Sequence, residues 1–408
     1  MPPIPRHLQP VLTARAARWP IVTLTGPRQS GKTTLCRASF PAKPYVSLEL
    51  PDVRDHALHD PRGLLRGLPD GAILDEVQRA PALLSYLQVD VDERPQPGRW
   101  ILTGSHNLLL MQSVAQSLAG RTALLQLLPL SLPELSDVGL LARYWTEAAQ
   151  LGGWPAPRDR GIPIGEWLAA YIASYVERDV RDVLRITDAA LFQRFLRLCA
   201  GRAGQILNLA ALAADAGISH GTATAWLSAL ETSYIAFRLQ PWHANLVSRE
   251  VKAPKLMFWD TALACALLGI RSPDELALHT ARGSLFENLV AVEACKRAIN
   301  RGEAAPWHHW RDSNGREVDL VCPDSHGNVT ALEAKSGETW TPEWARAVEQ
   351  MGAELAAKGR TLRGAVVYGG DEPRLAGGGA HTVDAVPWHG LAAWLGAGQP
   401  SPTAPPPR

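Results

Sequence analysis

The sequence predicts an α/β protein whose first third folds as a doubly wound, mainly parallel sheet. Short apolar runs, each bounded by Gly, Pro or charged residues, alternate there with helical patterns. Runs of this length are typical of strands that a parallel sheet buries on both faces. Their alternation with helices indicates a doubly wound domain. The predicted strands are Ile21–Thr25, Tyr45–Leu50, Ala72–Leu74 and Trp100–Thr103, with helical material at Thr34–Ala38 and Pro81–Val91.

The composition is that of a folded protein, with 46% hydrophobic and 20% charged residues in a chain of 408. At roughly 150 residues per domain, this length suggests two or three domains. The 41 basic and 40 acidic residues nearly cancel, which argues against a surface coated in basic patches for non-specific nucleic-acid binding. The five cysteines are scattered without a CxxC pair, which fits a reducing compartment and no zinc site. No apolar run resembles a signal peptide or a membrane span, so we expect a cytoplasmic protein without a membrane partner.

A phosphate-binding loop follows the first predicted strand. Residues 26–33 read GPRQSGKT, which fits G-x4-G-K-[ST], and they open onto a helix. Gly26 and Gly31 allow the backbone to turn so that consecutive N–H groups point at phosphate oxygens near the positive end of the helix dipole. Lys32 would reach the β- and γ-phosphates, and the Thr33 hydroxyl would bind Mg²⁺. The predicted ATP-binding residues are Gly26, Gln29, Ser30, Gly31, Lys32, Thr33 and Thr34.

Two acidic residues, Asp75 and Glu76, follow the third predicted strand. Asp75 would hold Mg²⁺ together with Thr33, and Glu76 would activate or orient the attacking water. Ser105, at the tip of the fourth strand, could contact the γ-phosphate or that water. Arg121 could stabilise charge in cis or from a neighbouring subunit, and a surface ion pair is its alternative. The sequence therefore predicts an ATPase with ATP and Mg²⁺ as its cofactors.

The middle of the chain fits a helix-turn-helix. Leu209–Ala216 predicts one helix and Gly217 the turn, and Ser219 would cap a second helix that runs through Leu230. This second helix offers no Arg, Lys, Asn or Gln, the side chains that pair bidentately with purines in the major groove. We therefore favour a structural or partner-binding role for the segment over DNA recognition.

Two strand-like runs, Ala236–Leu239 and Leu256–Trp259, follow the helix-turn-helix and could form a wing. Basic residues lie near the second run, at Arg249, Lys252 and Lys255. They could touch phosphates, a contact that positions a nucleic acid without reading its sequence.

Three carboxylates and a lysine stand on predicted elements of the C-terminal third. Glu333 and Lys335 are two residues apart on a predicted strand, so both face the same side. A hairpin could bring Asp319 to Glu333, and Glu287 lies on the predicted helix Leu285–Lys296. Carboxylates that hold Mg²⁺ and a lysine that orients water can together cleave a phosphodiester. The alternative is an edge strand with a solvated, charged face.

Several segments, in this order and spacing, resemble those of a known family. They are GPRQSGKTTL, LDEVQR, LTGSHNLL, SLAGR, PKLMFWD, GSLFENLV, REVDL and LEAK. The family is the prokaryotic AAA-type ATPases whose C-terminal half is a domain of unknown function, and the resemblance runs from about Thr13 to Lys335. It implies a P-loop AAA-like core, a winged-helix-like middle and a C-terminal α/β domain similar to restriction endonucleases of the PD-(D/E)xK type.

The expected domain limits follow from these segments. They are a P-loop AAA-like domain at 1–135, a connecting and helical segment at 136–189, a winged-helix-like domain at 190–260, a restriction-endonuclease-like domain at 261–396 and a disordered tail at 397–408. The predicted function is Mg²⁺-dependent ATP hydrolysis coupled to a C-terminal half that acts on DNA or RNA. The alternative is a nucleotide-dependent switch whose last domain only binds a protein or nucleic-acid partner. Self-association is left open.

Overall fold

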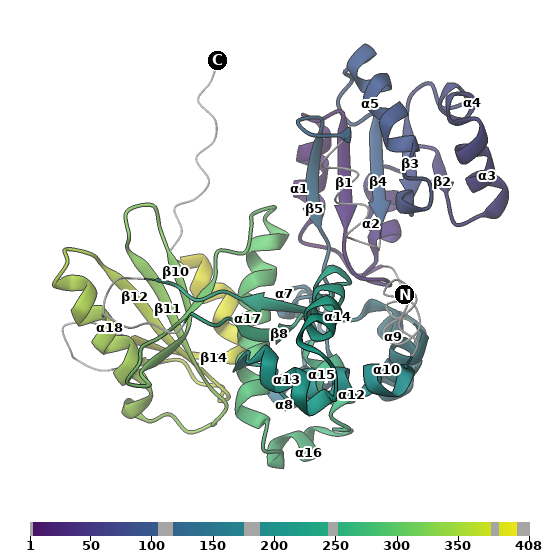
Figure 1. The fold of residues 1–408 in the computed structure, drawn as a ribbon. Coiled ribbons are helices and arrows are strands. Elements are labelled where there is room, and N and C mark those ends of the chain that lie inside the picture. The colour runs from purple at the N-terminus through teal and green to yellow at the C-terminus, as the bar shows by residue number, and fades with distance from the viewer. Residues whose placement is uncertain (1–2, 105–116, 175–187, 244–251, 377–382, 398–408) are drawn as a thin grey trace.

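The computed structural model describes residues 3–104, 117–174, 188–243, 252–376 and 383–397. Within these residues the chain builds a five-stranded, a three-stranded and a six-stranded sheet, one after another along the sequence (Figure 1). The predicted residue Ser105 and the tail after residue 397 lie outside the described residues. Among the helices that are described, none combines the length and the apolar character that a bilayer crossing requires.

The five-stranded N-terminal sheet is parallel, with the order β2-β3-β4-β1-β5. Its strands are β1 (Ile21–Thr25), β2 (Tyr45–Ser47), β3 (Ala72–Asp75), β4 (Trp100–Gly104) and β5 (Thr122–Gln126). Every residue of the inner strands β1, β3 and β4 is buried, which confirms the prediction drawn from their apolar runs. The sequence missed β5, because this edge strand alternates between buried and exposed residues and merges into a longer apolar run.

Helices cover both faces of this sheet, over two separate apolar clusters. They are α1 (Gln9–Ala16), α2 (Lys32–Ser39), α3 (Pro51–His59), α4 (Pro61–Arg66), the short η1 (Val77–Arg79) and α5 (Leu83–Glu93). The helix α2 begins directly at the end of the glycine-rich loop, so the loop is held between the carboxyl end of β1 and the amino end of α2.

The segment after β5, which begins the stretch 136–189 that we expected to be connecting and helical, is helical and well packed where the structure describes it. Its helices are α7 (Leu132–Ser136), α8 (Trp145–Leu151), α9 (Pro155–Arg160) and α10 (Ile164–Tyr171). The aromatic side chains of Trp154, Trp167 and Tyr171 are buried, and their rings lie 4.7–5.2 Å apart, centroid to centroid. This Gly-, Pro- and Trp-rich segment therefore contains a small aromatic core and is not a linker.

The middle unit has the helices and strands that the sequence predicted. Helix α13 (Leu209–Ala216) is followed by Gly217 in the left-handed conformation, and the Ser219 hydroxyl accepts a hydrogen bond from the Thr222 N–H at the start of α14 (His220–Thr232). Helix α12 (Ala189–Ala200) precedes them. The strands β6 (Gln205–Ile206), β7 (Ala236–Leu239) and β8 (Lys255–Phe258) form an antiparallel sheet in the order β6-β8-β7.

The C-terminal unit is a mixed sheet of the order β13-β14-β12-β11-β10-β9. The neighbours β9, β10 and β11 are antiparallel, whereas β12 runs parallel to β11 and to β14. The strands are β9 (His308–Arg311), β10 (Glu317–Pro323), β11 (Val329–Lys335), β12 (Leu362–Tyr368), β13 (Arg374–Ala376) and β14 (Val383–Pro387). The helices are α15 (Thr261–Leu267), α16 (Pro273–Leu278), α17 (Arg282–Asn300), η3 (Pro342–Ala345), α18 (Arg346–Ala356), η4 (Trp388–Gly390) and α19 (Leu391–Ala397).

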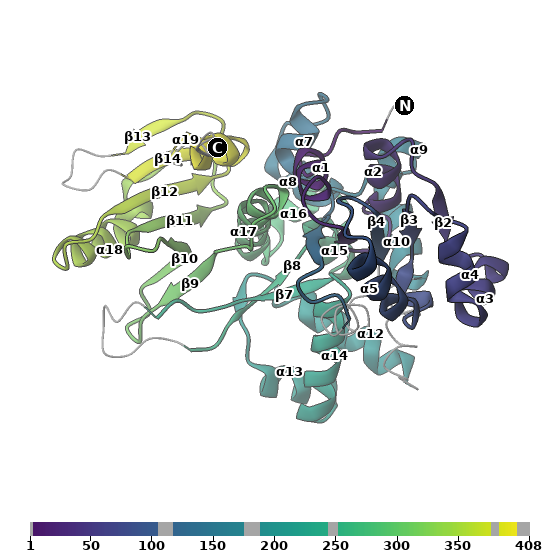
Figure 2. The ribbon, with the colours of Figure 1, turned by 90° about the horizontal axis from the view of Figure 1, so that it is seen from above.

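Helix α17 lies between the six-stranded sheet and the helices of the preceding segments (Figure 2). One continuous apolar core consequently runs from Leu128 to Leu395 and includes residues of α8, α14, β8, α17 and β11. The boundary that we expected between residues 260 and 261 passes through this core, since both β8 and α15 contribute buried residues to it. The N-terminal sheet, by contrast, has apolar clusters of its own.

Candidate functional site

The glycine-rich loop joins β1 to α2 in a conformation that demands glycine. Gly26, Gln29 and Gly31 all have positive φ angles, of 149°, 61° and 94°. A Cβ atom on Gly26 would lie 2.1 Å from the Leu127 carbonyl oxygen, which is backbone and cannot move aside. The close approach of Leu127 is therefore sufficient to explain why position 26 is a glycine.

Lys32 is buried at the first position of α2, with 5% of its surface exposed. Its Nζ donates hydrogen bonds to the carbonyl oxygens of Gly26, at 3.0 Å, and Pro27, at 2.8 Å. Burial lowers the pKa of Lys32 to about 8, although the carboxylates of Glu76 and Asp75 oppose this shift. An anion in the loop would supply the charge that this ammonium group lacks. The fully buried hydroxyl of Ser30 also has no partner among the described residues.

Asp75, the last residue of β3, gathers hydroxyl groups around its carboxylate. Its Oδ2 accepts hydrogen bonds from the Thr33 hydroxyl, at 2.9 Å, and the Tyr45 hydroxyl, at 2.6 Å, and its Oδ1 accepts one from Thr103. Burial and the bond to Asp75 raise the pKa of Tyr45 to about 12. The oxygens of Thr33 and Asp75 thus lie side by side, in a set that suits a hard divalent cation.

Glu76 follows with a φ angle of 57°, in the left-handed region that residues other than glycine rarely adopt. Its half-buried carboxylate accepts a hydrogen bond from the Gln78 side chain. Strained backbone of this kind costs on the order of 1–3 kcal/mol and is concentrated at functional sites. The Glu76 carboxylate lies near enough to Lys32 to oppose, together with Asp75, the lowering of the Lys32 pKa.

Arg121 lies at the wrong end of the sheet to act on this loop in cis. It precedes β5, whose first residue Thr122 is in register with Ile21, the first residue of β1. The loop follows the last residue of β1, so about 13 Å of strand separates the two. Arg121 instead forms an ion pair with Asp92, with N–O distances of 2.6 and 2.7 Å. The cis alternative is therefore wrong, and the ion pair is the alternative that the structure contains.

A buried arginine from the N-terminal segment, missed by the sequence analysis, holds the loop from outside. Arg6 donates to the Ser30 carbonyl at 2.7 Å, to the Leu128 carbonyl at 2.7 Å and to the Glu134 carboxylate at 3.0 Å. Burial alone would raise the pKa of Glu134, but Arg6 and the N–H groups of Ser131 and His7 hold that pKa below its usual range. Nothing local in the sequence indicates these contacts, since Ser30 is 24 residues from Arg6 and both Leu128 and Glu134 are more than 100 residues away.

A second contact joins β1, the strand that leads into the glycine-rich loop, to the middle unit. The Tyr234 hydroxyl, just beyond the end of α14, donates to the Thr25 hydroxyl at 2.7 Å. Thr25 is the last residue of β1 and directly precedes Gly26. Tyr234 has a φ angle of 57°, which is strained for an aromatic residue. The start of the loop is thereby connected to the helix-turn-helix segment.

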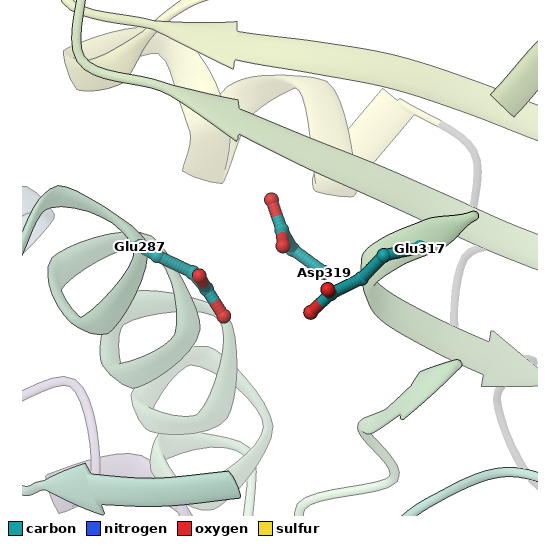
Figure 3. Close-up of side chains that lie close together, drawn as sticks. All are labelled: Glu287, Glu317 and Asp319. Atoms are coloured by element: carbon teal, nitrogen blue, oxygen red, sulfur yellow. The ribbon is translucent and has the colours of Figure 1, made fainter. Parts of the chain in front are cut away.

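Three carboxylates converge in the C-terminal unit. Oxygen atoms of Glu287 on α17 and of Glu317 and Asp319 on β10 all lie within 4.8 Å of one another. Figure 3 shows the three side chains projecting into the space between this helix and this strand. The pairing of β10 with β9 shifts register between Val318 and Val321, so the strand is irregular where it carries Asp319. Glu287 and Asp319 were predicted from the sequence and Glu317 was not, although residues two apart on a strand, as Glu317 and Asp319 are, face the same side.

Lys255, the first residue of β8, places its ammonium group among these carboxylates. Its Nζ lies 2.5 Å from a Glu287 oxygen and 3.2 Å from an Asp319 oxygen, and it also pairs with Glu317. Burial opposes its charge, but Asp319 and Glu287 raise the pKa of Lys255 above its usual value. The expected contact of Lys255 with phosphates is therefore wrong, because 2% of its side chain is exposed. Lys252 is exposed, and Arg249 lies outside the described residues.

The other two predicted residues lie on β11, next to Asp319. Lys335 Nζ is 2.5 Å from Glu333 Oε1, so the two side chains reach one another as their spacing predicted. Asp319 Oδ2 accepts a hydrogen bond from the Ala334 N–H at 2.9 Å, which fixes Asp319 against β11. Glu333 is buried, and its Oε2 has no partner among the described residues. Burial, together with the charge of Asp319, raises the pKa of Glu333 to about 8.

Comparison with protein families divides the chain into three parts. Residues 18–136 match the model of an AAA domain. Residues 142–274 and 282–389 match two models that are each described as a domain of unknown function, DUF8612 and DUF4143. The uncharacterized proteins Rv2008c of Mycobacterium tuberculosis and Mb2031c of Mycobacterium bovis are each 32% identical over 358 residues, which cover 87% of this chain and 77% of theirs.

Among solved structures, a Walker-type ATPase of Pyrococcus abyssi has a TM-score of 0.43 at 17% identity and covers 64% of this chain and 94% of its own. The AMPPCP-bound DnaA of Aquifex aeolicus has a TM-score of 0.27 at 14% identity, with coverage of 55% and 85%. Both TM-scores are low. The evidence for a nucleotide site therefore comes from the AAA domain match and from the residues of the site.

Proposed function

Because the chain belongs to the same family as the mycobacterial proteins Rv2008c and Mb2031c and contains an AAA domain, we propose that it binds ATP with Mg²⁺ and hydrolyses it. The observation that carries the proposal is the group of Lys32, Thr33 and Asp75 at the carboxyl edge of the parallel sheet. Ligands of open α/β sheets bind at this edge. The buried Lys32 without a full countercharge fits a phosphate, and the paired oxygens of Thr33 and Asp75 fit Mg²⁺.

Each residue then has a distinct role in the proposed reaction. Lys32 and the N–H groups of Gln29, Ser30 and Thr34 bind the phosphates at the start of α2, where the helix dipole favours negative charge. Thr33 and Asp75 would hold Mg²⁺, which neutralises charge on the phosphate oxygens. Glu76 orients the attacking water and accepts its proton.

The test is phosphate release from ATP by the full-length protein, measured with Mg²⁺ and again with excess EDTA. We expect release with Mg²⁺ and a loss of about tenfold or more with EDTA, because Thr33 and Asp75 cannot neutralise the phosphate charge themselves. ATP binding without any turnover would restrict the protein to a nucleotide-dependent switch. Turnover that is equal in both conditions would contradict the assignment of Thr33 and Asp75.

We further propose that the middle unit is a winged helix, with limits near 190–260. This is supported by the element order α12-β6-α13-α14-β7-β8, in which three helices accompany a small antiparallel sheet whose first strand, β6, follows the first helix. The second helix of the turn, α14, buries Trp226, Leu227 and Leu230. Helix α14 has no Arg, Lys, Asn or Gln, the side chains that pair bidentately with purines. We therefore assign this unit to a structural or partner-binding role and not to sequence-specific DNA binding.

A second candidate function is metal-dependent cleavage of a nucleic acid by the C-terminal unit. It is favoured by the convergence of Glu287, Asp319 and Glu317, with Glu333 and Lys335 beside them. The element order α17-β9-β10-β11-α18-β12, with β12 parallel to β11, also supports a restriction-endonuclease-like domain. In this proposal the carboxylates hold Mg²⁺, and Lys335 orients the water.

The second candidate predicts that Asp319→Ala abolishes any cleavage of plasmid or single-stranded DNA in the presence of Mg²⁺ or Mn²⁺. The expected loss is at least about 10²-fold, since Asp319 would be a metal ligand. Asp274→Ala is the matched control, because Asp274 is an exposed aspartate at the start of α16. Cleavage that persists in Asp319→Ala would come from elsewhere. No cleavage by the wild-type protein, with or without ATP, would favour the switch with a partner-binding domain.

A further inference from the structure

The acidic cluster of Glu287, Glu317 and Asp319 already contains a cation, which is part of the protein. The Lys255 ammonium touches all three carboxylates and is shielded from solvent. It comes from β8 of the middle unit, whereas the carboxylates come from α17 and β10. A lysine from one unit thus fills the centre of a site built by another.

The charges of the cluster remain incompletely balanced around this lysine. Three carboxylates face the Lys255 ammonium group, and Arg311, a further cation among the described residues, reaches Glu317 Oε2 at 3.3 Å with 39% of its side chain exposed. Lys335 is engaged by Glu333. The buried Glu333 Oε2, on the strand that anchors Asp319, has no partner among the described residues. A doubly charged cation would suit this set of oxygens better than a single ammonium group.

We infer that Glu287, Glu317 and Asp319 form one divalent-cation site for which a metal ion and the Lys255 ammonium compete. The inference rests on the metal site of the second candidate function and adds the residue that controls it. Both cations need the same carboxylate oxygens, which lie within 4.8 Å of one another, so they exclude each other. Metal binding therefore requires Lys255 to leave the cluster.

The position of Lys255 in its strand permits this withdrawal. Its backbone pairs with Ile206 of β6 and Leu239 of β7, so the withdrawal is a movement of the long side chain and leaves the strand in place. The residues after it, Leu256 to Phe258, stay anchored in the core. With Lys255 bound to the three carboxylates, the middle unit is joined to the C-terminal unit and a metal ion has no access to the cluster.

The inference is tested by isothermal titration of Mn²⁺ into the full-length protein without nucleotide. Lys255→Met is expected to bind Mn²⁺ about tenfold or more tightly than the wild type, because a competing charge within 3.2 Å has been removed. Lys252→Met is the matched control, since Lys252 is exposed in the same segment. Adding Asp319→Asn to Lys255→Met should abolish the gain.

Two results would overturn the inference in different ways. Equal Mn²⁺ affinity of the wild type and Lys255→Met would leave the metal site in place but exclude Lys255 as its competitor. Absence of binding at the cluster in both proteins would remove the metal site, and the second candidate function with it.

A measurement on the wild-type protein covers the case in which Lys255→Met does not fold. Acetic anhydride labels accessible lysines, and mass spectrometry reports the fraction modified at each one. We expect Lys255 to be protected without metal and its labelling to rise about fivefold or more with Mn²⁺, as for a group that moves from burial to solvent. Labelling of Lys252 should not change. Labelling of Lys255 that is independent of Mn²⁺, while Mn²⁺ binds, would contradict the competition.

Discussion

Lys32→Ala should reduce the rate of ATP hydrolysis at saturating ATP by about 10²–10³-fold, the usual cost of removing one preorganised donor to developing charge. Lys32 is expected to have this effect because it is buried inside the loop, and its hydrogen-bond partners among the described residues are the carbonyls of Gly26 and Pro27, which a phosphate can replace. The measurement is phosphate release under Mg²⁺, with circular dichroism to verify that the variant is folded.

Lys43→Ala is a close control for this experiment. Lys43 also donates to two carbonyl oxygens, those of Asp70 and Arg99, at 3.4 and 3.2 Å. Asp70 and Arg99 precede β3 and β4, so this lysine lies at the opposite edge of the same sheet. Its removal should leave the hydrolysis rate unchanged. A Lys32→Ala protein that hydrolyses ATP as fast as Lys43→Ala would refute the proposed ATP site.

Glu134→Ala should destabilise the protein by about 3–5 kcal/mol, the typical cost of removing one partner of a buried ion pair. The substitution leaves the Arg6 guanidinium buried without its carboxylate, and it removes the acceptor for the N–H groups of His7 and Ser131. Arg6 also holds the Ser30 carbonyl, so the phosphate-binding loop should loosen as well. Urea denaturation measures the change in the free energy of unfolding.

Glu303→Ala provides the contrast, because the Arg301–Glu303 ion pair is exposed. Its loss should change stability by about 0–1 kcal/mol. In the double variant Arg6→Ala and Glu134→Ala, the loss should be smaller than the sum of the two single losses, since no buried charge remains unpaired. A loss for Glu134→Ala as small as that for Glu303→Ala would mean that Arg6 does not depend on this carboxylate.

The sequence predicted those parts of the fold that are specified locally. The inner strands, the glycine-rich loop and the turn at Gly217 each depend on residues within about ten positions of one another, so their patterns are legible in the sequence. The same applies to Glu333 and Lys335, whose separation by two on a strand is sufficient to bring them together.

The rest depended on contacts between distant segments. Lys255 stands in the apolar strand KLMF, where a lysine normally extends to solvent, and its burial follows from carboxylates that lie more than 30 residues away. Arg6 is indistinguishable in sequence from an exposed terminal arginine until Glu134 is placed beside it. Without the strand β5, the end of the sheet to which Arg121 belongs could not be determined, so the catalytic role and the surface ion pair both stayed open.

The continuous core from Leu128 to Leu395 restricts how this chain could be recombined with others. A segment transplanted from residue 261 onward would carry α17 without β8 and α8, and would expose the apolar side of a helix in which 14 of 19 residues are buried. The N-terminal sheet has apolar clusters of its own, so an exchange near residue 127 divides far less of the interior. The middle and C-terminal units therefore share one interior, and a graft that takes the C-terminal unit should take the middle unit with it.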